Sequence, residues 1–166
     1  MAEGMITRSL DADHAVVTWD RVLIQVWRLG ITPDAITDLE RVARSYASEQ
    51  PGGKISSISI IERTSPPPPE HVRKDLSRFY KNLAPQLHEA IIVAEGGGFR
   101  AALVRGVGVA LSSLAPKSLP FKFVDTIRSA SITIGPHLSP GSGGASELEA
   151  VVERVRTMAA GVGEKY

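Results

Sequence analysis

Three consecutive glycines between an apolar segment and an amphipathic segment are the part of the sequence best suited to bind a ligand. Residues 90–94 are uninterruptedly apolar, Glu95 follows them, and a helical pattern begins at Phe99 after the glycines. Backbone N–H groups at the start of a helix attract negative charge, because they are free to donate and the helix dipole is positive there. The candidate ligand-binding residues are Gly96, Gly97, Gly98, Arg100 and Arg105.

The motif does not match a known nucleotide-binding loop. The lysine and hydroxyl residue of a P-loop are missing, and the glycines lack the spacing of a dinucleotide fingerprint. Two interpretations therefore remain, a site for a small anionic or apolar ligand and a tight turn that requires glycine.

Three carboxylates are expected at or just after the ends of strands, where open α/β sheets place their sites. They are Glu62, Glu95 and Asp125. A pair of them could perform acid–base catalysis. Nothing in the sequence indicates that any two converge, so capping and solvation are the default interpretation.

The remaining reactive residue types form no catalytic pattern. The chain has no cysteine, its serines show no nucleophile elbow, and the four histidines are too dispersed for a metal-binding spacing. These histidines are His14, His71, His88 and His137. We therefore assign no catalytic residue and expect neither a metal nor a cofactor.

Length and composition favour one compact domain. The chain has 166 residues, enough to bury a core without disulfides, and the absence of cysteine is typical of a cytoplasmic protein. A net charge of +1 with mixed signs argues against a nucleic-acid partner. No apolar run approaches the roughly 20 residues that a membrane span needs, and no signal peptide is visible.

The pattern of apolar residues and turn signals predicts alternating strands and helices. A hairpin is expected over residues 14–29, interrupted at Asp20 and Arg21, and Thr32–Pro33–Asp34 is typical of a helix start. Strands are predicted over 54–61, 90–94 and 121–124. Helices are predicted over 32–47, 72–87, 99–114, 126–134 and 147–158.

This order, β-β-α-β-α-β-α-β-α followed by a further helix, predicts an α/β fold with helices packed on a mixed sheet of about five strands. Residues 1–13 are polar and are interpreted as a flexible leader, and 14–138 as the domain. Residues 139–144 are interpreted as a Gly/Ser linker, and 145–166 as a C-terminal helix and tail. The last helix could pack on the domain or reach a partner.

Three segments resemble the bacterial SpoIIAA-like proteins of the STAS fold, within the broader STAS/SEC14-like group. They are PPPEHVRKDL, VAEGGGFRAALVRGVGVAL and LPFKFVDTIRSA, and the similarity spans about residues 14–138. The resemblance implies a single STAS-like domain that binds another protein or a ligand. It also implies a phosphorylation site after the third strand, where the nearest hydroxyls are Thr64 and Ser65.

The sequence thus predicts a non-enzymatic regulatory or scaffolding domain that acts by protein–protein interaction. Self-association is expected through an edge strand or the helix that carries Gly106 and Gly108. The alternative is a binding module for a small apolar or anionic ligand near Gly96–Gly98. An unrecognised enzyme is the third hypothesis.

Overall fold

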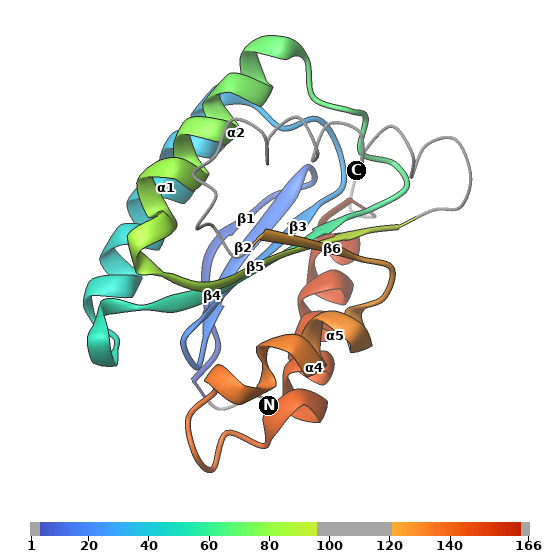
Figure 1. Ribbon diagram of the computed structural model, residues 1–166. Coiled ribbons are helices and arrows are strands. Elements are labelled where there is room, and N and C mark those ends of the chain that lie inside the picture. The colour runs from blue at the N-terminus through green and yellow to red at the C-terminus, as the bar shows by residue number, and fades with distance from the viewer. Residues whose placement is uncertain (1–3, 96–120, 164–166) are drawn as a thin grey trace.

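A computed structural model describes residues 4–95 and 121–163, which form a six-stranded mixed sheet with helices on both faces (Figure 1). The strands are β1 (Ile6–Leu10), β2 (His14–Trp19), β3 (Val22–Trp27), β4 (Ile55–Ile61), β5 (Leu87–Ala94) and β6 (Phe121–Val124). They lie in sequence order across the sheet. The pairs β1–β2 and β2–β3 are antiparallel, whereas β3–β4, β4–β5 and β5–β6 are parallel. The predicted α/β class is confirmed.

Four α-helices among the described residues cover the sheet. They are α1 (Pro33–Ser48), α2 (Glu70–Leu83), α4 (Ile127–Ile134) and α5 (Gly144–Gly163). Short 3-10 turns follow at η1 (Pro51–Gly53), η2 (Ala84–Gln86) and η3 (Gly135–His137). Figure 1 shows α1 and α2 on one face of the sheet, with α4 and α5 on the other. In the part of the chain that is described, none of these helices is both long and apolar enough to cross a bilayer.

The hairpin β2–β3 forms as predicted. Trp19 pairs with Val22, so Asp20 and Arg21 make a two-residue turn, and both have positive φ (38° and 68°). A two-residue turn of this hand matches the right-handed twist of the flanking strands. The strand β3 that follows is buried at every position, as expected for a strand with helices over both faces.

The expectation that residues 1–13 form a flexible leader is wrong, because Ile6–Leu10 is the edge strand β1 and makes the sheet six-stranded rather than five-stranded. Four of its five residues are exposed. A bulge between Thr7 and Ser9 also shifts the register against β2. A mostly solvated, bulged edge strand does not need the apolar alternation by which strands are recognised.

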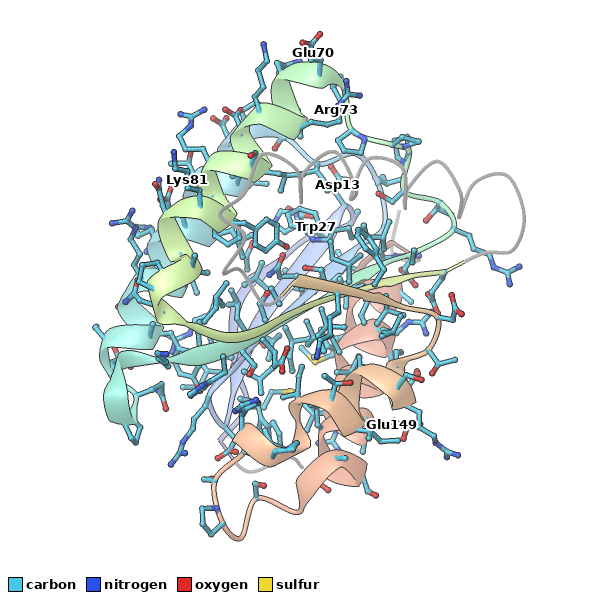
Figure 2. The ribbon with its side chains drawn as sticks, viewed as in Figure 1. Asp13, Trp27, Glu70, Arg73, Lys81 and Glu149 are labelled. Atoms are coloured by element: carbon cyan, nitrogen blue, oxygen red, sulfur yellow. The ribbon has the colours of Figure 1, made fainter. Side chains whose placement is uncertain are left out.

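Each face of the sheet has its own core. Leu39 of α1 and Phe79 of α2 pack against Leu23 on one face. On the other face, Ile134 of α4 and Val152 of α5 pack against Ile58. Figure 2 shows Glu70 at the start of α2 and Lys81 on the side of that helix away from the sheet, while Trp27 lies on the sheet and is 2% exposed. Because Val152 of α5 belongs to the second of these cores, the final helix packs back on the domain.

Two helices begin where the sequence predicts, because a threonine satisfies an N–H group that the helix leaves open. Thr32 Oγ1 accepts from the N–H of Ala35 at 3.2 Å, and Thr126 Oγ1 accepts from the N–H of Ser129 at 3.1 Å. Pro33 occupies the first position of α1, where its missing N–H costs nothing.

The Gly/Ser segment before α5 is held against the hairpin. The N–H of Ser139 donates to Asp20 Oδ2 at 2.9 Å, and the Ser139 hydroxyl donates to Asp20 Oδ1. Gly143 has φ of +96°, and a Cβ there would lie 2.7 Å from Glu147 Cβ, so glycine is needed at this turn. The segment connects η3 to α5 along a defined path.

Candidate functional site

The carboxyl ends of the parallel strands gather charged side chains at one edge of the sheet. Arg28 follows β3, Glu62 follows β4, Glu95 follows β5 and Asp125 follows β6. Because β3 to β6 run in the same direction, these four residues lie at the same edge. This is the edge at which open α/β sheets bind ligands.

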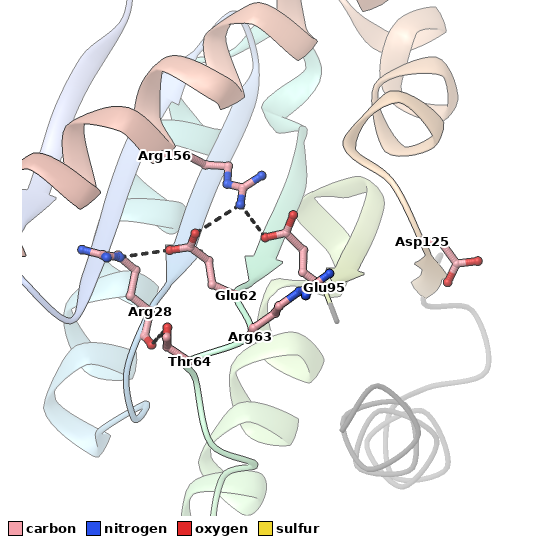
Figure 3. Close-up of a pocket in the computed structure, with 7 residues that line it drawn as sticks. All are labelled: Arg28, Glu62, Arg63, Thr64, Glu95, Asp125 and Arg156. Carbon is pink, nitrogen blue, oxygen red and sulfur yellow. Dashed lines mark hydrogen bonds and ion pairs between the residues drawn. The ribbon is translucent and has the colours of Figure 1, made fainter. Parts of the chain in front are cut away.

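A polar pocket of about 470 Å³ opens there, and we call it the carboxyl-edge pocket (Figure 3). It is lined by Arg28, Glu62, Arg63, Thr64, Glu95, Asp125 and Arg156. Arg156 comes from α5, so the pocket joins the strand ends to the C-terminal helix.

An ion-pair network crosses this pocket. Arg28 Nε donates to Glu62 Oε1 at 3.0 Å, and Arg156 Nη2 donates to Glu62 Oε2 at 3.2 Å and to Glu95 Oε1 at 2.6 Å. Figure 3 shows the two carboxylates on either side of the Arg156 guanidinium. Arg28 Nη1 also donates to the carbonyl of Ala159 in α5 at 2.9 Å. Both arginines therefore connect α5 to strand ends.

The network is largely shielded from solvent, which changes the acidity of one member. The side chains of Arg156, Glu62 and Glu95 are 26%, 19% and 24% exposed. Burial raises the pKa of Glu95 above its ordinary value, Arg156 opposes this shift, and the negative charges of Glu62 and Glu153 add to it. Glu95 is thus a carboxylate whose ionised form is disfavoured by its surroundings.

Arg63 differs from the other two arginines of the pocket. It is exposed, and it forms neither an ion pair nor a hydrogen bond within the described parts of the chain. Asp125 does have a partner. Arg63 therefore brings to the pocket five N–H donors that its neighbours in the described chain do not occupy.

The two predicted phosphorylation residues differ in accessibility. Thr64 is exposed, lines the pocket and donates its hydroxyl to the carbonyl of Arg28. Ser65 is fully buried and donates its hydroxyl to the carbonyl of Leu29 at 2.8 Å. In this conformation, only Thr64 offers its side chain to solvent.

The predicted ligand residues Gly96, Gly97, Gly98, Arg100 and Arg105 lie outside the described residues. Glu95, which directly precedes the glycines, lines the pocket. Of the three candidate carboxylates, Glu62 and Glu95 converge on Arg156, which the sequence did not indicate.

The site residues that sequence reasoning missed are Arg28, Arg63 and Arg156. Arg28 and Arg63 are next to predicted strand ends, a signal that could have found them. Arg156 lies 94 residues from Glu62 and 61 from Glu95 along the chain, so only the packing of α5 brings them together.

Two of the dispersed histidines also meet. The rings of His88 and His137 stack with centroids 4.6 Å apart, and His137 Nε2 lies 3.6 Å from Glu89 Oε1. Burial lowers the pKa of His88, and the nearby His137 lowers it further. Over residues 4–95 and 121–163, no group of three or more His, Cys, Asp or Glu side chains is arranged to hold a metal ion.

Comparison with known proteins gives no relative for this chain: a scan against protein-family models and searches of curated proteins and of solved structures all find no match. The resemblance to SpoIIAA-like proteins thus depends on the sequence segments quoted above.

Proposed function

We propose that this domain is a non-enzymatic binding module whose ligand is a small anionic molecule held in the carboxyl-edge pocket. The observation that carries the proposal is the exposed guanidinium of Arg63, which has no partner among the described residues and lines a polar cavity of about 470 Å³. A planar guanidinium matches the geometry of a carboxylate or phosphate and can bind it through two parallel hydrogen bonds.

The hydrogen-bonding capacity of the other arginines supports an anion. Arg28 donates to Glu62 and to the Ala159 carbonyl. Arg156 donates to Glu95 and pairs with Glu153. Each guanidinium carries five N–H donors, so both retain donors for a further acceptor. Both oxygens of Glu62 already accept from arginines, so it has little to offer a cationic ligand.

The same contacts favour binding over catalysis. Glu62 and Glu95 are the two carboxylates that converge, and both are hydrogen-bonded to Arg156. A general base must be free to accept a proton from a substrate. Without a bound anion, these carboxylates instead act as ion-pair partners that position the arginines.

Binding could also serve regulation, since the pocket is built partly from α5. A ligand that contacts Arg156 touches the helix and the network at the ends of β4 and β5 at the same time. The regulatory role through a protein partner or self-association stays a prediction. The arrangement supports this prediction, because a ligand bound at Arg156 would contact α5 directly.

The test is amide chemical-shift mapping by NMR during titration with inorganic phosphate. Shifts are expected to concentrate at Arg28, Arg63, Thr64 and Glu95, and Arg63→Ala should weaken the response by about tenfold or more, the loss of one charge-assisted bidentate contact. Arg78→Ala is the matched control, because Arg78 is an exposed arginine of α2 outside the pocket. Shifts elsewhere, or an unchanged response in Arg63→Ala, would refute the proposal.

A further inference from the structure

The network around Arg156 contains more negative than positive charge. Arg156 contacts three carboxylates: Glu62 at 3.2 Å, Glu95 at 2.6 Å and Glu153 at 3.6 Å. Arg28 supplies the second cation of the network, through Glu62. Two guanidinium groups therefore face three carboxylates, and one carboxylate is not balanced within the network.

Glu95 is the member whose ionisation is least supported. Glu62 is bound by two arginines, and Glu153 is 56% exposed and so remains well hydrated. Glu95 is 24% exposed, and within residues 4–95 and 121–163 it pairs only with Arg156. Its raised pKa, due first to burial, agrees with this geometry. An added negative charge in the pocket should therefore act most strongly on Glu95.

Resting on the proposed function, we infer that binding of an anion in the carboxyl-edge pocket is coupled to the uptake of a proton by Glu95. The anion brings negative charge beside Glu95 and draws on the same arginine donors that hold its ionised form. A proton then moves from solution to a carboxylate oxygen of Glu95. The bound state gains one proton for each anion in the limit of full coupling.

Among residues 4–95 and 121–163, charged groups from four parts of the fold face Glu95 and enter this balance. Arg156 and Glu153 face it from α5, Glu62 and Arg63 come from the end of β4, and Arg28 and Asp125 follow β3 and β6. The arginines keep their charge throughout the accessible pH range. Proton uptake therefore depends on the carboxylates, and Glu95 is the one that burial disfavours in its ionised form.

The consequence is an anion affinity that increases as pH falls. If one proton is taken up with each anion, linkage makes the association constant rise by up to about tenfold per pH unit. The rise occurs between the pKa of Glu95 in the free protein and its higher pKa in the complex. The domain would then bind its ligand as a combined sensor of anion concentration and acidity.

Isothermal titration calorimetry with sulfate tests the coupling. Sulfate does not titrate at the pH used, so every proton taken up belongs to the protein. Titrations at several pH values from about 4.5 to 7.5, each in two buffers of different ionisation enthalpy, give the number of protons taken up, by linkage. The wild type is compared with Glu95→Gln, which keeps the size and one acceptor oxygen. Glu149→Gln is the control, because Glu149 pairs with Arg128 outside the pocket.

We expect proton uptake in the wild type and in Glu149→Gln, and sulfate binding without uptake in Glu95→Gln. Sulfate binding with no uptake in the wild type, or with the same uptake in Glu95→Gln, would overturn the coupling and leave the proposed function intact. No sulfate binding in the wild type at any pH would overturn both. Should Glu95→Gln fail to fold, NMR titration of the Glu95 side-chain carboxyl in the wild type, with and without sulfate, decides the question: its pKa should rise in the presence of sulfate, and an unchanged pKa would overturn the coupling.

Discussion

Arg156→Ala should destabilise the domain by removing the cation that holds two strand-end carboxylates to α5. Breaking a fully buried ion pair costs about 3–5 kcal/mol, whereas a surface pair contributes about 0–1 kcal/mol. The side chains here are 26%, 19% and 24% exposed, so the network lies between these limits. We expect a loss of about 1–3 kcal/mol in the free energy of unfolding near pH 8.

The loss should shrink as the solution becomes more acidic. Without Arg156, the pKa of Glu95 in the folded state rises further above its value in the unfolded chain, because Arg156 is the group that lowers it. The folded variant then binds more protons than the unfolded chain at pH values between these two pKa values. Its stability falls as pH rises through this window and recovers as pH falls. The deficit relative to wild type should therefore be smaller near pH 5 than near pH 8.

Urea denaturation followed by circular dichroism measures both effects. The matched control is Arg154→Ala, an exposed arginine on the same helix with no partner in the described chain, which should change stability by less than about 0.5 kcal/mol. A loss in Arg156→Ala no larger than in Arg154→Ala would refute the role of the network. A deficit that stays constant between the two pH values would refute the charge argument.

Two further substitutions test the fold. Ile134→Ala removes a fully buried side chain between α4 and the sheet and should lower the free energy of unfolding, measured by urea denaturation, by about 2–5 kcal/mol. The control is Ile132→Ala, because Ile132 is 61% exposed on the same helix. Equal losses in the two variants would show that α4 does not pack as described. Arg21→Gly relieves the backbone at φ of 68° and keeps the N–H that donates to the Tyr46 hydroxyl. Arg21→Gly should increase the free energy of unfolding by up to about 1 kcal/mol and so raise the midpoint temperature of thermal unfolding. A lowered midpoint temperature would contradict the turn geometry.

Local signals in the sequence predicted much of the fold. Thr32 and Thr126 indicate helix starts because their side-chain oxygens can satisfy an N–H group of the first turn, and both do so. Asp20 and Arg21 indicate a turn because they interrupt two apolar runs, and the structure places a two-residue turn there. Such features depend on a few neighbouring residues, so they can be read without tertiary information.

The features that depend on distant contacts could not be predicted in this way. Ile6–Leu10 gains its strand conformation from pairing with β2 and has little apolar pattern of its own. Glu62 and Glu95 were expected at strand ends, but their convergence requires Arg156 from a helix that begins 49 residues after Glu95. The register of α5 against the sheet decides this contact, and no local pattern encodes it.

Native mass spectrometry of the protein purified from its own host tests the central claim most directly, with the denatured mass as reference. We predict an added mass in the native wild type that disappears on denaturation and corresponds to an anionic molecule small enough for the carboxyl-edge pocket. The same mass should be lost or strongly reduced in Arg63→Ala and retained in Arg78→Ala. A bare mass for the wild type, or an added mass equally abundant in Arg63→Ala, would contradict anion binding at this pocket.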